Sequence, residues 1–358
     1  MSVPVNQIIC GDNVETLRTL PDACVDSCVT DPPYGLEFMG KKWDRGVPGV
    51  ELWREVLRVL KPGGHLLAFA GTRTQHRMAT AIEDAGFEVR DMIAWVYGSG
   101  FPKSLDVSKA IDKAAGAERE VVGTKRGTAM ESPDSAIGMP GKTVGVKQIG
   151  VDVSITAPAT EAAKQWQGWG TALKPSLEPI TVARKPLCGT VAENVLQHGT
   201  GGLNVDGCRI ATVDNLNGGG YSGGTPKTMF SGLGRLQPNE FVQPQGRWPA
   251  NLIHDGSDEV VGLFPDDGDA SAARFFYCAK ADASERRQSK HPTIKPVALM
   301  RYLVRLVTPP GGLVLDPFGG SGTTAEAARL EHCRFLLMEL NPEYCADAAE
   351  RLRQGVLF

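Results

Sequence analysis

The pattern of apolar and polar residues along the first 98 positions predicts strands and helices in turn. Short apolar runs that end at turn residues predict strands, and apolar residues spaced three or four apart predict helices. The predicted helices cover residues 14–20, 51–60 and 75–85, and Lys61-Pro62-Gly63-Gly64 stops the second of them. The predicted strands cover residues 7–10, 25–30, 65–70 and 91–97.

The same alternation returns near the end of the chain. It predicts helices at 297–307, 323–330 and 342–353, with strands at 313–315 and 335–338. Strands that alternate with helices are typical of an α/β protein with helices on both faces of a parallel or mixed sheet. We expect both ends of the chain to share one doubly wound, mostly parallel sheet.

Residues 99–250 have a different character. They hold 23 of the 42 glycines, and 16 Lys and Arg against 13 Asp and Glu, with few sustained periodic runs. A long irregular insert is usually functional or disordered, and its interleaved aromatic residues favour at least partial order. We therefore expect three parts: 1–98, an approximate insert 99–290, and 291–358. The aromatic residues are Trp166, Trp169, Tyr221, Phe230 and Trp248.

Composition narrows the class of protein only slightly. The 358 residues are 42% hydrophobic and 22% charged, which is ordinary for a soluble globular protein. No stretch has the length of a membrane span and the N-terminus lacks a signal-peptide pattern, so we expect no membrane partner and a cytoplasmic location. The eight cysteines include no C-x-x-C pair, so no metal site is expected. A net charge of −3 is compatible with a local basic groove for nucleic acid.

A turn with the sequence Asp31-Pro32-Pro33-Tyr34 follows the strand 25–30. Two prolines end the strand and stiffen the backbone, at the strand end where open α/β sheets bind ligands. The Asp31 carboxylate and the Pro32 carbonyl form an acceptor pair for an amino group, and the Tyr34 ring offers a face to a planar base. A β-turn with a capping aspartate is an equally good interpretation of the tetrapeptide alone.

A glycine-rich turn, Asp316-Pro317-Phe318-Gly319-Gly320-Ser321-Gly322, joins the strand 313–315 to the helix 323–330. Glycines let the backbone approach a ligand, and a helix N-terminus offers free N–H groups. Glu339 ends the next strand at a spacing suited to ribose hydroxyls. These features indicate a nucleoside-containing cofactor, with tight strand–helix packing as the alternative. Residues 320–325 also fit G-x-G-x-x-A, which keeps an NAD-dependent oxidoreductase open.

Together these motifs resemble those of the S-adenosylmethionine-dependent DNA amino-methyltransferases, which methylate the exocyclic nitrogen of adenine or cytosine. The order of catalytic turn, variable insert and glycine loop resembles the permuted β group. His291-Pro292-Thr293-Ile294-Lys295-Pro296 is similar to the motif before that group's glycine loop, and Gly11-Asp12-Asn13 to its adenine-contacting position. The insert resembles a target-recognition region by position, and the chain is generally similar to phage and prophage methylases.

The resemblance implies a Rossmann-like fold, S-adenosyl-L-methionine as cofactor, and double-stranded DNA from which the target base is flipped out. In the catalytic turn, Asp31 and the Pro32 carbonyl bind the amino group, Pro33 completes the turn, and Tyr34 stacks on the base. Methyl transfer is then a direct in-line displacement. The implied cofactor contacts are Asp12 for the adenine, Glu339 for the ribose, Lys295 and Thr323 for the carboxylate, and Asp316, Phe318, Gly319, Gly320, Ser321 and Gly322 in the loop.

Several alternatives stay open at this point. Aspartate at the first position of the catalytic turn favours N6-adenine and serine favours N4-cytosine, but the correlation is imperfect. Protein-glutamine methyltransferases carry asparagine there, and an oxidoreductase leaves Asp31-Pro32-Pro33-Tyr34 unexplained. By analogy with the family we expect a homodimer and a bacterial or phage-encoded restriction–modification role. Candidate DNA contacts are Lys41, Lys42, Trp43, Arg45, Arg184, Lys185, Arg235 and Arg247.

Overall fold

The computed structural model describes residues 3–35, 46–98, 100, 104–130, 148–214, 216, 244–266, 270–279 and 294–354. They form two compact units. Unit 1 comprises Met1–Gly98 and Leu177–Phe358, and unit 2 comprises Ser99–Ser176. The sequence-based candidates that lie outside the described residues are Lys41, Lys42, Trp43, Arg45, Tyr221, Phe230, Arg235, His291, Pro292 and Thr293.

The strands and helices of the flanking regions begin and end close to the predicted positions. Among the described residues, no helix has the length and hydrophobicity needed to cross a membrane. The strands are β1 Gln7–Cys10, β2 Val25–Thr30, β3 Leu60–Phe69, β4 Glu88–Val96, β5 Val121–Met130, β6 Gln148–Thr156, β7 Leu177–Arg184, β8 Leu252–His254, β9 Tyr277–Cys278, β10 Leu313–Asp316 and β11 Arg334–Glu339. The α-helices are α1 Asn13–Arg18, α2 Val50–Val59, α3 Gln75–Asp84, α4 Val107–Ala114, α5 Glu161–Gln165, α6 Val191–His198, α7 Asp258–Val261, α8 Val297–Val307, α9 Thr323–Leu330 and α10 Pro342–Gln354, and the 3₁₀ helices are η4 Asp206–Cys208 and η5 Ala272–Phe275.

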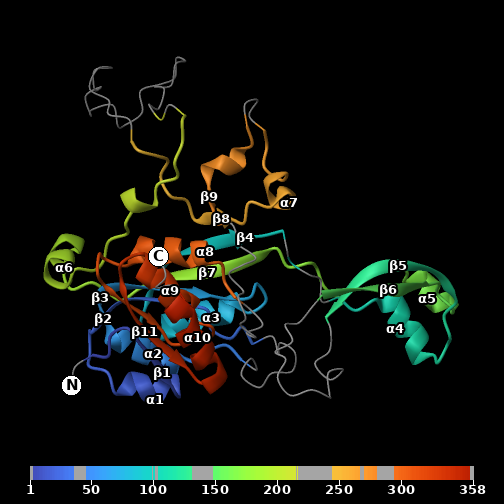
Figure 1. Ribbon diagram of the computed structural model, residues 1–358, viewed down its shortest axis with the longest axis horizontal. Helices are drawn as coiled ribbons and strands as arrows, with labels where there is room; N and C mark the ends of the chain where they lie inside the picture. Colours follow the sequence, from blue (N-terminus) through green and yellow to red (C-terminus); the bar gives the residue numbers. More distant parts are fainter. Residues whose placement is uncertain are drawn as a thin grey trace. The chain divides into compact units, whose positions relative to one another are not determined.

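One large sheet organises unit 1. In the part of the chain that the structure describes, its strand order is β1-β11-β10-β2-β3-β7-β4-β8-β9 (Figure 1). Strand β7 is antiparallel to both of its neighbours, and the other pairs are parallel. The N-terminal and C-terminal parts of the chain therefore share one mostly parallel, Rossmann-like sheet, as the sequence predicts.

Apolar residues pack against both faces of this sheet. Successive residues of a strand point to opposite faces, and β3 shows the result. Leu67 lies in a core cluster with residues of α8 and α9, whereas Leu66 lies in a second cluster with residues of α1, α2 and α3. Because both faces are covered, the ligand site of such a sheet lies at its edge, beyond the ends of the strands.

The direction of the chain changes between the neighbouring strands β10 and β2. From β10 the chain continues through α9 to β11, on one side of the sheet. From β2 it continues through α2 to β3, on the other side. A crevice opens at the carboxyl ends of two such strands, and it is the usual ligand site of an open α/β sheet. The catalytic turn follows β2 and the glycine loop follows β10, so both lie where such a crevice is expected.

Residues 99–250 contain more regular structure than their sequence predicts. In unit 2, β5 and β6 form an antiparallel ribbon beside α4 and α5 (Figure 1). The buried Asp112 carboxylate joins these parts, since it accepts hydrogen bonds from Arg119 and from the backbone and side chain of Thr160. Beyond Ser176 the chain returns to the sheet of unit 1 as β7, so the compact inserted unit is shorter than the predicted insert 99–290.

Candidate active site

The carboxylate of Asp31 is held at both of its oxygens. It follows the buried strand β2 directly, and its side chain is 22% exposed. The Tyr34 hydroxyl donates to Oδ1 at 2.7 Å, and the Lys295 ammonium donates to Oδ2 at 2.7 Å. The two prolines between Asp31 and Tyr34 stiffen this turn. The predicted catalytic residues Asp31 and Tyr34 are thus in direct contact just after the end of β2.

Lys295 lies at the centre of this group and is only 8% exposed. Besides Asp31, its ammonium group contacts Glu178 at 3.1 Å and the Tyr34 hydroxyl at 3.0 Å, and lies 4.9 Å from the centre of the Phe69 ring. Burial opposes the charged form, but the carboxylates of Asp31 and Glu178 outweigh it and raise the pKa of Lys295. The sequence predicts that Lys295 binds the cofactor carboxylate, whereas its contacts here are with the catalytic turn.

Glu178 is a site residue that the sequence analysis missed. Its carboxylate accepts hydrogen bonds from Tyr34 at 3.0 Å and from Tyr97 at 3.4 Å. Because β7 is antiparallel, its first residues lie beside the last residues of β3 and β4. The β-branched run Ile180-Thr181-Val182 is the sequence signal that could have revealed the strand, but nothing local to Glu178 indicates its partners.

Burial and the nearby negative charges of Asp31 and Glu178 raise the pKa of the Tyr34 phenol well above its usual range. The hydroxyl therefore keeps its proton and acts as a donor. Burial likewise raises the pKa of Tyr97, with the charge of Glu178 as a further cause. The site thus holds two carboxylates, one ammonium and two neutral phenols.

Asp316 shapes the turn between β10 and α9 from the inside. Its buried carboxylate accepts hydrogen bonds from the Thr30 hydroxyl at 2.6 Å, the Thr324 hydroxyl at 2.6 Å and the Phe318 backbone N–H at 3.0 Å. Both oxygens are thereby engaged within the protein. The sequence predicts a cofactor contact for Asp316, and its contacts here assign it to holding the loop that carries the other predicted cofactor residues.

The glycines of this loop occupy positions that other residues would not fit. A Cβ on Gly319 would lie 2.2 Å from Leu337, and one on Gly322 would lie 2.8 Å from Ala348. Gly322 also has φ of +83°, in the left-handed region that favours glycine. Asn13, which the sequence analysis gave no separate role, donates from its side chain to the Pro317 carbonyl at 3.0 Å and fixes the loop from the N-terminal side.

Glu339 lies beside the same loop. Its carboxylate accepts from the Gly320 N–H at 2.9 Å and from the Asn341 N–H at 2.8 Å, which fixes both oxygens in place. Asp12 is exposed at the start of α1 and caps it through the Glu15 N–H. The Gly11 N–H binds the Glu339 carbonyl at 3.0 Å, so the predicted adenine and ribose residues are neighbours.

This arrangement fits a nucleoside cofactor. Fixed carboxylates are good acceptors for ribose hydroxyls and for an amino group, and glycines leave room for a ligand close to the backbone. Phe318 is partly buried, and Ser321 and Thr323 are 5% and 7% exposed at the start of α9. The structure brings together the predicted residues from Asp12, the glycine loop and Glu339, while Lys295 belongs with Asp31.

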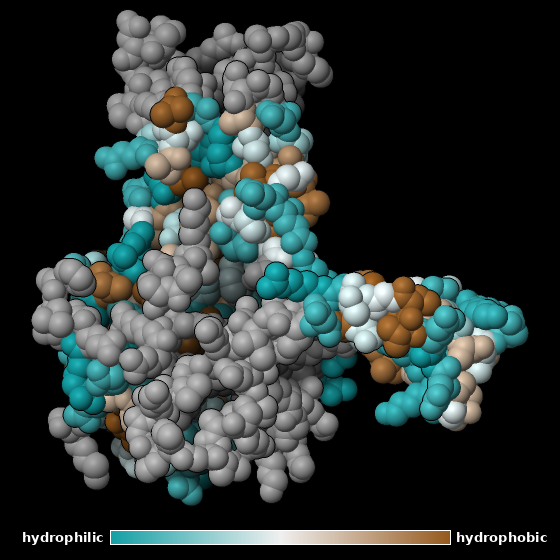
Figure 2. Space-filling view, turned by 45° about the vertical axis from the view of Figure 1, so that its right-hand side comes forward, coloured by the Kyte–Doolittle hydropathy of each residue, from teal (hydrophilic) through white to brown (hydrophobic). Residues whose placement is uncertain are grey.

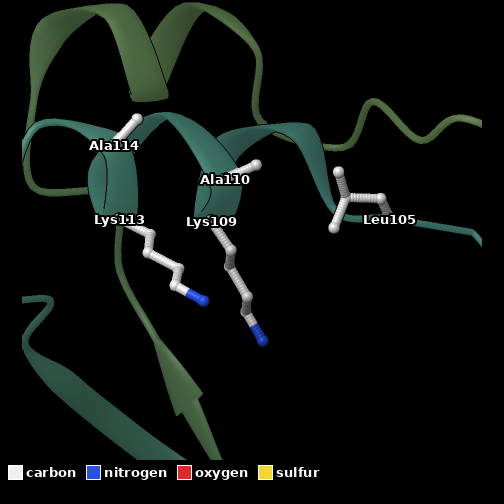
Figure 3. Close-up of a pocket in the computed structure, with 5 residues that line it drawn as sticks. All are labelled: Leu105, Lys109, Ala110, Lys113 and Ala114. Carbon is white, nitrogen blue, oxygen red and sulfur yellow. The ribbon is translucent and has the colours of Figure 1, made fainter.

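Unit 2 carries surface features of its own. Apolar side chains gather on it, among them Val121, Trp169 and Leu173 at 59%, 60% and 93% exposure (Figure 2). A pocket of about 440 Å³ lies against α4, and Lys109 and Lys113 extend in the same direction from this helix (Figure 3). Only residues of unit 2 line this pocket, and none of them is a predicted site residue.

Three of the side chains predicted to contact DNA instead contact other residues of unit 1 in the structure. Arg184 pairs with Glu88 at 2.6 Å, and Arg247 pairs with Asp214 at 2.6 Å. Lys185 donates to the Leu60 carbonyl at 2.7 Å. These contacts within the protein account for the positive charges at the three positions without a contact to nucleic acid. A contact of these side chains with DNA stays a prediction.

Comparison with known proteins identifies the family of this chain. A family model described as DNA methylase matches residues 25–114 and 243–350, which is more than half of the chain. The type II methyltransferase M.HindIII of Haemophilus influenzae is 25% identical over 388 residues, covering 96% of this chain and 93% of that protein. The DNA adenine methyltransferase YhdJ of Escherichia coli is 42% identical over 62 residues, which is 17% of this chain and 21% of that protein.

Solved structures show a more distant likeness. A putative DNA modification methylase from Thermus thermophilus, complexed with S-adenosyl-L-methionine, is 19% identical, with a TM-score of 0.45 and coverage of 99% of this chain and 95% of that one. The cytosine-N4-specific PvuII DNA methyltransferase is 15% identical, with a TM-score of 0.46 and coverage of 98% and 87%.

Proposed function

We propose that this chain, which belongs to the DNA methylase family, methylates the exocyclic N6 amino group of adenine in double-stranded DNA. Its family membership makes it an S-adenosylmethionine-dependent DNA methyltransferase, and the family covers both N6-adenine and N4-cytosine enzymes. The observation that carries the choice of adenine is the carboxylate of Asp31 at the first position of the catalytic turn.

The catalytic turn binds the amino group of the base. A base inside a duplex cannot enter the crevice, so it must be flipped out of the helix. Asp31 and the Pro32 carbonyl then accept the two amino hydrogens, which directs the nitrogen lone pair away from the turn. Tyr34 provides the aromatic face on which the base stacks.

The glycine loop and its neighbours hold the cofactor. Glu339 accepts hydrogen bonds from ribose hydroxyls, and Asp12 accepts one from the adenine amino group. Phe318, Gly319, Gly320, Ser321, Gly322 and Thr323 line the methionine end. When bound there, S-adenosylmethionine supplies an electrophilic methyl group on a sulfonium sulfur.

Positioning supplies most of the catalysis. The amino nitrogen would bond to the methyl carbon while the carbon–sulfur bond breaks and leaves its electron pair on the sulfur, without a covalent enzyme intermediate. The protein's task is therefore to hold the nitrogen at the right place. The nitrogen becomes positively charged and must lose a proton. Asp31 is the nearest carboxylate to the bound amino group in this arrangement, and it receives that proton before release to solvent.

Unit 2 and the following segment are our candidates for target recognition. Family resemblance gives the insert that role by position, and unit 2 presents exposed lysines and tryptophans, both of which suit nucleic acid. A homodimer and a restriction–modification partner stay predictions from the family.

Methyl transfer from labelled S-adenosylmethionine to bacterial genomic DNA that lacks adenine methylation tests the proposal. The DNA is digested to nucleosides and the labelled product identified, with Asp31→Ala as the control. We expect N6-methyladenine from the wild type and a loss of at least about a hundredfold in the variant, which still binds the cofactor. Labelled N4-methylcytosine would contradict the choice of base. DNA that stays unlabelled although the protein binds the cofactor would contradict the choice of DNA as the methyl acceptor.

A further inference from the structure

The Tyr34 hydroxyl has one proton and two carboxylate acceptors. Oδ1 of Asp31 lies 2.7 Å from the hydroxyl oxygen, and Oε2 of Glu178 lies 3.0 Å from it. A phenol donates one hydrogen bond at a time with good geometry, so these two acceptors are alternatives. The Lys295 ammonium fills the other side of the hydroxyl at 3.0 Å, as a donor.

The target amino group and the Tyr34 hydroxyl share the Asp31 carboxylate as an acceptor. Lys295 already binds Oδ2 of Asp31 at 2.7 Å, and the Tyr34 hydroxyl oxygen lies 2.7 Å from Oδ1. An incoming amino hydrogen binds either the remaining lone pair of Oδ1 or the position that the phenol holds, and in the second case the Tyr34 hydroxyl must turn to another acceptor. If Tyr34 had no other acceptor nearby, its buried hydroxyl would lose a hydrogen bond when the base binds, at a cost in binding energy.

Glu178 also changes the charge of the site. Its carboxylate lies 3.1 Å from the Lys295 ammonium, so two carboxylates face one cation in a buried position. Without Glu178, Lys295 and Asp31 would neutralise each other. With it, the group keeps a net negative charge, which stabilises the positive charge that develops on the methylated nitrogen.

We propose that Glu178 is a positioning residue for methyl transfer, which accepts the hydrogen bond of the Tyr34 hydroxyl when the target amino group binds Asp31 and leaves the group with a net negative charge. Tyr97, which donates to the other oxygen of Glu178 at 3.4 Å, keeps this carboxylate in place. The inference rests on the proposed role of Asp31. It holds for an adenine or a cytosine amino group, because both present the same two N–H donors.

Two substitutions at position 178 separate the two roles. Glu178→Gln keeps an oxygen that accepts the hydrogen bond of Tyr34 but removes the charge, whereas Glu178→Ala removes both. We expect kcat for DNA methylation to fall about tenfold in the glutamine variant and about a further tenfold in the alanine variant. The KM for S-adenosylmethionine and the melting temperature should stay close to the wild-type values in both.

The decisive comparison is made in a Tyr34→Phe background. Phenylalanine has no proton to donate, so the difference between glutamine and alanine at position 178 should disappear there. Glu88→Gln and Glu88→Ala serve as matched controls, because Glu88 is on the neighbouring strand β4 and pairs with Arg184 instead. We expect wild-type kcat from both Glu88 variants.

Three outcomes would overturn the inference. The first is an unchanged kcat in the Glu178 variants, and the second is a glutamine–alanine difference that persists in the Tyr34→Phe background. The third is a loss explained entirely by unfolding or by weaker cofactor binding. An N4-methylcytosine product would contradict the proposed base but not this inference, because the kinetic comparison of the Glu178 variants does not depend on which base is methylated. A wild type without any DNA methyl transfer would overturn both proposals.

Discussion

Asp316 and Asp31 are two aspartates at neighbouring strand ends with different roles. Burial is the largest cause that raises the pKa of the Asp316 carboxyl, from an ordinary value of 3.8 to about 6, against the hydrogen bonds from Thr30 and Thr324. Asp31, in contrast, is partly exposed at the crevice and has an ammonium partner. Asp316 thus connects β2, β10 and α9, while the partly exposed Asp31 is available to a substrate.

A methyl group at Gly319 should damage the cofactor loop. In Gly319→Ala the new Cβ would lie 2.2 Å from Leu337, a buried residue of β11, so the loop or the strand must shift. Such overpacking typically costs about 1–3 kcal/mol of unfolding free energy. We also expect weaker S-adenosylmethionine binding, measured by calorimetry alongside urea unfolding. Gly202→Ala, where no atom lies within 4 Å, is the control. Equal cofactor affinity in both variants would contradict the close packing.

The candidate site was predictable where its residues belong to a local motif. Asp31, Tyr34 and the glycine loop each follow a strand in a recognisable turn. Glu178 was not predictable, because its contact with Tyr34 joins positions 144 residues apart in the sequence. Lys295 was identified through a motif, but its neighbours depend on where the start of α8 meets the end of β2, and only the fold determines that.

His65 should make the stability of unit 1 depend on pH. It lies in β3 at 5% exposure, and burial, followed by the charges of Arg184 and Arg90, lowers its pKa from 6.5 to about 4. Between these values the unfolded chain binds a proton that the folded chain does not, so stability falls as the pH falls. This group should remove about 2 kcal/mol of unfolding free energy between about pH 7 and about pH 5.

Urea unfolding at both pH values measures this effect. His65→Gln cannot take up the proton, so its stability should change less over the same interval than that of the wild type. His76→Gln, at an exposed position of α3, should keep the wild-type dependence. An identical pH dependence in the wild type and the His65 variant would show that His65 is not held in the neutral form.

Elements were predictable where apolar runs end at strong turn signals. Helices α8 and α9 have the predicted bounds, and β1 and β2 also match. Strand β7 was missed because Pro179 interrupts its pattern and Pro175 and Pro186 flank it. Strand β3 begins five residues before the predicted one, since its pairing with β2 continues across a register shift at Lys61-Pro62-Gly63-Gly64, where Gly63 has φ of +76°.

In the whole molecule, the order of the strands in the sheet differs from their order in the chain. The catalytic strand β2 comes early and the cofactor strand β10 comes late, yet they are neighbours. The chain can therefore carry a large insert between them without disturbing the crevice. The chain leaves the sheet for unit 2 and returns to it at adjacent positions, because Val96 and Leu177 are paired residues of β4 and β7.

The charge distribution favours a role for unit 2 in binding DNA. Residues 99–176 hold ten Lys and Arg against eight Asp and Glu, whereas the rest of the chain holds 28 against 33. Attraction to phosphates is the main source of affinity for DNA, so a net negative unit 1 should bind it weakly alone. Lys109 and Lys113, one turn apart on α4, are exposed cations of unit 2 (Figure 3).

Replacement of residues 99–176 by a short Asn-Gly turn tests this division of roles. The turn can connect β4 to β7 because their paired ends are adjacent, and unit 1 keeps both faces of its core. We expect cooperative unfolding and S-adenosylmethionine binding to persist, with a loss of at least about tenfold in DNA affinity and in kcat/KM for methylation. Calorimetry with the cofactor is the control for folding. A shortened protein with unchanged kcat/KM would mean that target recognition lies in unit 1.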